Sequence, residues 1–135
     1  DSGAYFLSFF TGFILIEIYN ANLKISPYFI ILLLWYPCFE TLFSIIRKLL
    51  KKKSALKPDN DHLHQLIFIL IKNRYQFKNL PANIITGILI NTFNLILLYS
   101  GSLNPYNTII QLKLIITATL SYMIIYILIK KSLNK

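Results

Sequence analysis

Both histidines of this 135-residue chain lie two positions apart and directly follow two aspartates, in the stretch 57–65 (KPDNDHLHQ). Imidazole and carboxylate side chains can bind a phosphate group or exchange protons near neutral pH. Residues i and i+2 point to different sides of a helix, whereas alternate residues of an extended backbone share a face. His62 and His64 are therefore either a paired phosphate-binding or acid/base site, or two solvated histidines beside a helix start capped by Asp59 or Asp61.

A second group with chemical potential is Asp1-Ser2-Gly3, which precedes an apolar segment. A carboxylate is a ligand that Mg²⁺ prefers, and small neighbouring residues let a phosphate approach closely. Asp and Ser are also favoured as helix N-caps. The tripeptide alone leaves both interpretations open.

Glu40 lies inside an apolar segment, about two helical turns before Arg47. A carboxylate within a membrane is costly, which favours a functional role, although its position near the segment end also allows a structural pairing. We expect Pro37 to kink this helix. We expect Asn91 and Asn94 to form hydrogen bonds between helices rather than to bind a ligand.

The composition predicts that membrane-spanning helices position these groups. Hydrophobic residues make up 56% and charged residues 14%, whereas a soluble domain has about 25% charged residues. A helix needs about 20 apolar residues to cross a bilayer. Four segments qualify, and a shorter apolar run at 66–71 is expected to form an interfacial or buried helix. The predicted spans are 4–19, 28–46, 83–99 and 109–129.

Lysine and arginine predict the orientation of these spans. The loop 47–82 holds nine of them and the C-terminal tail three more, whereas loop 20–26 holds only Lys24 and loop 100–108 holds none. Basic residues stay on the cytoplasmic side, so this loop and both chain ends are predicted to be cytoplasmic. The net charge of +9 is thus explained by topology and anionic lipid rather than by nucleic acid.

The chain begins at Asp1 and its only methionine is Met123. A cleaved signal peptide would explain the missing initiator but would deliver the N-terminus to the outside. We therefore expect a C-terminal fragment of a larger membrane protein. The expected fold class is all-α, a polytopic transmembrane helix bundle.

The segment 35–48 (WYPCFETLFSIIRK), the lysine-rich turn after it, and Pro58-Asp59 with 62–65 (HLHQ) resemble the polyprenyl-phosphate N-acetylaminosugar-1-phosphate transferases. These are the MraY/WecA-type enzymes of glycosyltransferase family 4. In that family an aspartate in a Gly-Asp-x-Gly motif opens a transmembrane helix, which Asp1-Ser2-Gly3 matches from its aspartate onward. A His-x-His-His motif follows in a cytoplasmic loop, and here Gln65 replaces its last histidine. Glutamine can form hydrogen bonds but cannot titrate.

This resemblance implies the C-terminal part of a single transferase domain over 1–135, within a bundle of about ten spans. It implies transfer of an N-acetylhexosamine-1-phosphate from a UDP-sugar to undecaprenyl phosphate in the bacterial inner membrane. Asp1 would bind Mg²⁺, or Mn²⁺ in its place, and His62 and His64 would contact the diphosphate. A homodimer is compatible with this assignment. The residues implied in binding the anionic substrates are Arg47, Lys48, Lys57, Asp59 and Gln65.

Two functions of other classes stay open. The chain could be a non-catalytic membrane protein that binds anionic lipid through its basic loop. It could also be a transporter fragment in which His62, His64 and Glu40 relay protons or a metal ion.

Overall fold

The computed structural model describes residues 2–52, 54 and 61–133. Within them the chain is helical and contains no strand. The helices in order are α1 (Ser2–Ala21), α2 (Pro27–Leu33), α3 (Trp35–Leu50), α4 (Leu63–Tyr75), α5 (Asn79–Ser102) and α6 (Thr108–Leu133). The predicted all-α class is confirmed, and the apolar run at 66–71 lies within α4.

Three helices, α1, α5 and α6, are long and apolar enough to cross a membrane. The pair α2 and α3 passes the same criteria together and would make a fourth span, although it is bent by 74°. The chain therefore has the character of a helical membrane protein with three or four spans. Each of these helices extends a few residues beyond the segment that the sequence predicted.

The bend between α2 and α3 lies at Leu34, three residues before Pro37. Proline has no N–H to donate to the carbonyl group four residues earlier, here that of Leu33, and its ring crowds that turn. The Leu34 N–H instead bonds to the Ile31 carbonyl oxygen at 3.2 Å. The expected kink is thus a full break on the N-terminal side of the proline.

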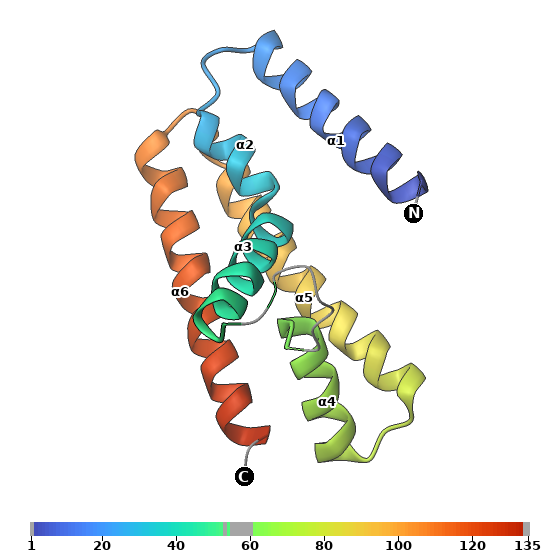
Figure 1. Ribbon diagram of the computed structural model, residues 1–135. Coiled ribbons are helices and arrows are strands. Elements are labelled where there is room, and N and C mark those ends of the chain that lie inside the picture. The colour runs from blue at the N-terminus through green and yellow to red at the C-terminus, as the bar shows by residue number, and fades with distance from the viewer. Residues whose placement is uncertain (1, 53, 55–60, 134–135) are drawn as a thin grey trace.

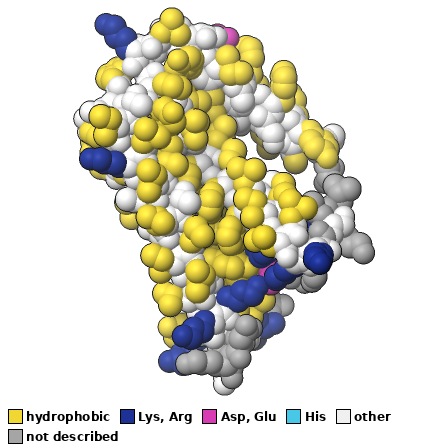
Figure 2. Space-filling view, turned by 60° about the vertical axis from the view of Figure 1, so that its left-hand side comes forward, with side chains coloured by type: hydrophobic (Ala, Val, Ile, Leu, Met, Phe, Trp, Pro, Cys, Tyr) yellow, Lys and Arg dark blue, Asp and Glu magenta, His cyan; other side chains and the backbone are white. Residues whose placement is uncertain are grey.

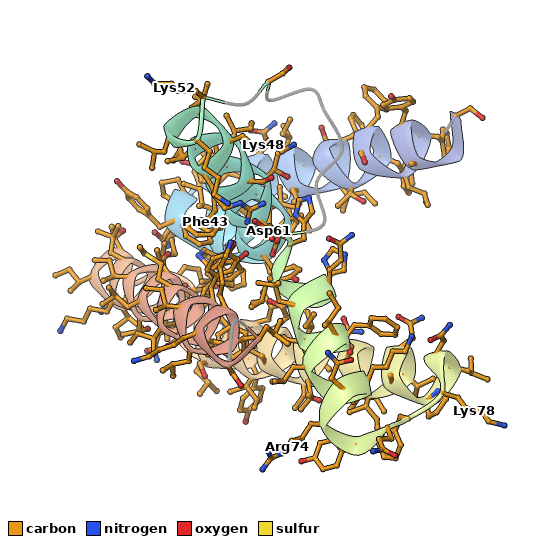
Figure 3. All side chains as sticks on the ribbon, turned by 60° about the horizontal axis from the view of Figure 1, so that its bottom comes forward. Phe43, Lys48, Lys52, Asp61, Arg74 and Lys78 are labelled. Carbon is orange, nitrogen blue, oxygen red and sulfur yellow. The ribbon has the colours of Figure 1, made fainter. Side chains whose placement is uncertain are left out.

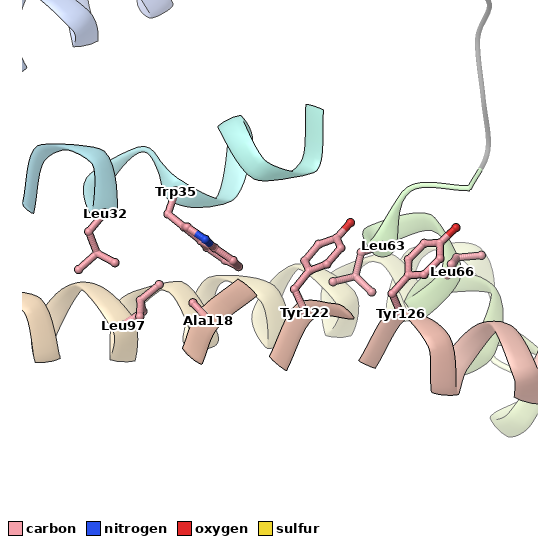
Figure 4. Close-up of a cluster of buried hydrophobic side chains, with 8 residues drawn as sticks. All are labelled: Leu32, Trp35, Leu63, Leu66, Leu97, Ala118, Tyr122 and Tyr126. Atoms are coloured by element: carbon pink, nitrogen blue, oxygen red, sulfur yellow. The ribbon is translucent and has the colours of Figure 1, made fainter. Parts of the chain in front are cut away.

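Aromatic side chains of α3 and α6 form the centre of the core (Figure 4). Trp35, Phe39 and Phe43 follow one another at intervals of four residues, so they line one face of α3. The ring centroid of Phe39 lies 5.0 Å from that of Tyr122, and Phe43 lies 4.9 Å from Tyr126, both in edge-to-face geometry. Such pairs add about 0.5–1.5 kcal/mol each beyond the area that they bury.

Helix α1 lies apart from the other helices (Figure 1), and Leu15 is its one buried residue within the described range. Hydrophobic side chains cover most of the face seen in Figure 2, and many of the lysines and arginines gather toward its lower part. Large hydrophobic side chains are exposed along α1, α5 and α6. Such extensive apolar surface is typical of contact with lipid or with other membrane helices.

Candidate functional site

Glu40 on α3 is buried, with 8% of its surface exposed, at the point where α3, α4 and α6 meet. Its Oε1 atom lies 3.0 Å from His62 Nδ1 and accepts a hydrogen bond from the Leu63 N–H at 3.0 Å. Its Oε2 atom accepts a hydrogen bond from the Tyr122 hydroxyl at 2.8 Å. Both carboxylate oxygens therefore have partners, as a buried charge requires. Glu40 pairs with these groups rather than with Arg47.

His62 and His64 lie together at the start of α4. His62 is the N-cap residue with extended backbone angles (φ −73°, ψ 147°), and His64 lies in the first turn. This extended residue allows two rings in an i, i+2 relationship to stack, with centroids 5.6 Å apart and planes inclined by 20°. The two rings thus lie against one another, with His64 exposed, and their role in binding phosphate or exchanging protons stays a prediction.

Asp61 was expected to be a candidate cap of this helix, and that prediction is wrong. The helix begins one residue later, with His62 as its N-cap, and the Gln65 side chain accepts from the His62 N–H at 3.5 Å. The Asp61 carboxylate instead accepts from Lys51 Nζ at 3.1 Å and from Lys130 Nζ at 2.9 Å. The other candidate cap, Asp59, lies outside the described residues.

The Asp61 carboxylate joins the ends of α3 and α6 at the mouth of this site. Partial burial would raise its pKa, but the hydrogen bonds and charges of Lys130 and Lys51 outweigh that effect and lower the pKa to about 2. Asp61 is therefore ionised throughout the neutral range. Figure 3 shows it in the centre of the view, with Arg74 and Lys78 at the periphery.

Arg47, the first residue of the predicted cytoplasmic loop 47–82, is buried in α3 with 8% of its surface exposed. Its guanidinium donates to the Asp61 carbonyl oxygen, to the Tyr126 hydroxyl at 2.9 Å and to Ser44 Oγ at 3.4 Å. It is drawn inward because these acceptors and the ring of Tyr126 line its position. Lys48 is half-buried near the end of the same helix. The role of both residues in substrate binding stays a prediction.

His64 and Gln65 line a groove of about 780 Å³ between α4 and α5. Its other wall carries three asparagines of α5, which follow one face of that helix at intervals of four or eight residues: Asn79, Asn83 and Asn91. The groove therefore brings several hydrogen-bonding side chains close to His64.

A larger groove of about 870 Å³ lies between α4, α5 and α6. Its lining is mostly aliphatic and aromatic, including Ile67, Leu89 and Ile129, and Arg74 lies among the lining residues. Tyr36 and Leu63 also line it. An elongated apolar ligand with an anionic group would match this combination of side chains.

The predicted Mg²⁺ site stays a prediction, because its proposed ligand Asp1 is not among the described residues. No group of three or more His, Cys, Asp or Glu side chains that could hold a metal ion occurs among them. Glu40 and Asp61 both face hydrogen-bond donors or lysines instead. Lys57 also lies outside the described residues.

Sequence reasoning missed the contribution of α6 to this site. Tyr122, Tyr126 and Lys130 contact Glu40, Arg47 and Asp61 respectively. Their spacing of four residues places them on one face of α6, and this stripe of hydroxyl and ammonium groups in an apolar helix was the signal that could have revealed them.

Compared with protein-family models, curated proteins and solved structures, the chain matches none of them.

Proposed function

We propose that this chain belongs to an enzyme that transfers an N-acetylhexosamine-1-phosphate from a UDP-sugar to undecaprenyl phosphate. A phosphate oxygen of the lipid attacks the β-phosphorus of the nucleotide sugar. A P–O bond forms there, the bond to the bridging oxygen breaks, and UMP leaves with that oxygen. Phosphoryl transfer depends mainly on positioning and on neutralising charge.

The observation that carries this proposal is the stacked pair His62 and His64 at the start of α4, beside the lysines that hold Asp61. Imidazole N–H groups and ammonium groups are donors suited to a diphosphate. The N-terminus of α4 adds a favourable field for an anion. Arg47, Lys48 and Lys57 would add to this positive environment.

The apolar groove between α4, α5 and α6 supports a lipid acceptor. A polyprenyl chain could lie along Ile67, Leu89 and Ile129 while its phosphate stays at a polar end. In this proposal the protein lies in the bacterial inner membrane, with both chain ends and loop 47–82 on the cytoplasmic side. The soluble nucleotide sugar would then reach the histidine pair from the cytoplasm.

The requirement for Mg²⁺ is part of the proposal through the family resemblance of Asp1. The metal would neutralise phosphate charge. We expect the full-length protein with Asp1→Asn to lose UMP release.

The test is UMP release by the full-length protein in membranes supplied with a UDP-N-acetylhexosamine, undecaprenyl phosphate and Mg²⁺. We expect His62→Ala and His64→Ala to lower the rate about 100-fold or more, the scale of a lost acid/base or charge-stabilising group. Lys24→Ala, in the exposed turn after α1, is the matched control and should leave the rate unchanged. Absence of UMP release by the native protein under these conditions would overturn the proposal.

The contact between Glu40 and His62 also favours one alternative, a proton relay in a transporter. Glutamate and histidine in a membrane helix are typical of such relays. Proton uptake into vesicles that contain the protein separates the two functions. A relay predicts flux that Glu40→Gln abolishes and predicts no UMP release.

A further inference from the structure

The carboxylate of Glu40 is the meeting point of three donors from two parts of the chain, the start of α4 and the middle of α6. His62 Nδ1 and the Leu63 N–H face Oε1, each at 3.0 Å, and the Tyr122 hydroxyl faces Oε2 at 2.8 Å. An ionised carboxylate only accepts hydrogen bonds. Where Glu40 is ionised, the Nδ1 atom of His62 therefore carries a proton and donates it to Oε1.

The other ring nitrogen, Nε2, is on the opposite side of the imidazole ring and is not held by Glu40. The side chain of His62 is 27% exposed, and its ring stacks on that of His64. A ring fixed by one nitrogen presents the other one in a defined direction. The Nε2 atom is therefore the part of His62 that can meet a ligand.

We propose that Glu40 is the positioning residue of His62: it holds the Nδ1–H form of the ring and thereby directs Nε2, the acceptor nitrogen of that form, toward the substrate, from which it can take a proton. The significance of this dyad for turnover rests on the proposed function. Tyr122 supports it by fixing the second carboxylate oxygen. The same carboxylate stabilises the N-terminus of α4, because a negative charge there is favoured by the helix dipole.

A purely structural role for Glu40 predicts something different. A helix cap needs only an acceptor for the Leu63 N–H and places no demand on the tautomer of His62. Glu40→Gln keeps an acceptor oxygen at Oε1 and removes the charge, whereas Glu40→Leu removes both. Glu40→Gln therefore tests the role of the charge, and Glu40→Leu tests the role of the acceptor oxygen in a side chain of similar size.

The first test is a ¹⁵N NMR spectrum of the imidazoles in detergent micelles at alkaline pH, where the rings are neutral. The chain has two histidines, so a His64→Gln variant assigns the signals. We expect His62 to carry its proton on Nδ1 in the native chain and in Glu40→Gln. We expect Glu40→Leu to shift it toward the Nε2–H form. A native His62 with a bare Nδ1 would overturn the inference.

The second test is UMP release by the full-length protein. We expect Glu40→Leu to lower kcat/KM about 10- to 100-fold, the usual effect of removing a group that orients a histidine ligand. Glu40→Gln should retain most of the rate and Tyr122→Phe should lower it a few-fold. Tyr99→Phe, an exposed tyrosine on α5, is the matched control. Full activity of folded Glu40→Leu would overturn the inference.

The two tests also separate this inference from the proposed function. If the native protein shows the Nδ1–H form of His62 but releases no UMP, the transferase proposal is overturned. The inference that Glu40 positions the His62 ring then still holds. If Glu40→Leu does not fold, the spectrum of the native protein still decides, because a His62 with a bare Nδ1 overturns the inference without any variant at Glu40. A Tyr122→Phe protein with unchanged tautomer and unchanged turnover would exclude the supporting role of that hydroxyl.

Discussion

The two ends of α6 are both closed by networks of polar groups, but one network is neutral and the other is charged. The neutral end is formed by Ser26, Gly101, Thr108 and Gln111. The charged end is formed by Glu40, Arg47, Asp61 and His62 with their partners on α6. Both polar networks lie on the same helix. Comparing them therefore separates the groups that a stable fold needs from the groups that the proposed function needs.

At the neutral end, hydrogen bonds of uncharged groups join the turn after α1 to the turn before α6. Gln111 is fully buried, and its Nε2 donates to the Gly101 and Asn104 carbonyl oxygens at 2.9 and 2.8 Å. The Ser26 N–H donates to the Pro105 carbonyl oxygen at 2.9 Å. Polar backbone groups of two turns are satisfied in this way, which is sufficient for a structural closure.

At the charged end, the carboxylate of Glu40 and the guanidinium of Arg47 are both buried in an apolar protein. Buried charges are costly even when they are paired, and apolar residues of equal volume are often at least as stabilising. The neutral end demonstrates that this chain can close a helix end without them. The buried charges of Glu40 and Arg47 therefore agree with the function proposed for the site beside the histidine pair.

The largest expected effect comes from Arg47→Ala, which removes a buried guanidinium from the Asp61 carbonyl, Tyr126 and Ser44. We expect the free energy of unfolding to fall by about 3 kcal/mol, since breaking a buried charged network leaves its partners unpaired. Arg47→Lys should restore only part of this free energy of unfolding, because the lysine ammonium group lacks the planar set of N–H donors of a guanidinium. Unfolding in mixed detergent micelles measures both. A loss below about 1 kcal/mol would show that this end is not held by the guanidinium.

At the neutral end, Gln111→Leu should lower the free energy of unfolding by about 2 kcal/mol. The change leaves the Gly101 and Asn104 carbonyls without their side-chain donor, and each lost buried hydrogen bond costs about 1 kcal/mol. UMP release per folded molecule should not change. A specific loss of turnover in folded Gln111→Leu would break the distinction between the two ends.

Gly101→Ala should have a smaller effect at the same end. A Cβ atom at this position would overlap the Leu32 side chain and would lie 3.1 Å from Gln111 Oε1. Leu32 is buried, so it can give way only by disturbing its own packing, at a cost of about 1–2 kcal/mol. Gly12→Ala on α1, where nothing lies within 4 Å of the added atom, is the control and should be neutral in the same unfolding measurement.

The sequence predicted the helical class and the approximate segments because long apolar runs carry a strong signal. The sequence also predicted a kink near Pro37. The position of the break is at Leu34, because Pro37 has no N–H to donate to the Leu33 carbonyl group. The pairing of His62 with Glu40 could not be derived, because 22 residues separate them and only packing of α4 against α3 and α6 brings them together. Gln65 was read as a departure from a motif, yet it lies at the third position of α4 and accepts from the His62 N–H.

The smallest effect is expected from Asp61→Asn, which tests the outermost contacts of the charged end. The Asp61 side chain is 34% exposed and pairs with Lys51 and Lys130, so solvent screens these pairs and we expect a loss below about 1 kcal/mol at neutral pH. The pH dependence is the sharper measurement. Because the folded protein lowers the pKa of Asp61 to about 2, the carboxylate stabilises the fold above its unfolded pKa of about 4.

That stabilisation should disappear as the pH falls from about 4 to about 2, so the native and Asp61→Asn proteins should converge in unfolding free energy over this range and differ by a constant amount above it. Lys51→Ala removes one of the two lysine partners of Asp61. In that background the difference in unfolding free energy between the proteins with and without Asp61→Asn should be smaller, whereas in a Lys24→Ala background it should not change. A difference that stays constant down to pH 2 would mean that the two lysines do not hold this carboxylate. The charged end would then be held by Glu40 and Arg47 alone, and Asp61 would contribute through its backbone carbonyl.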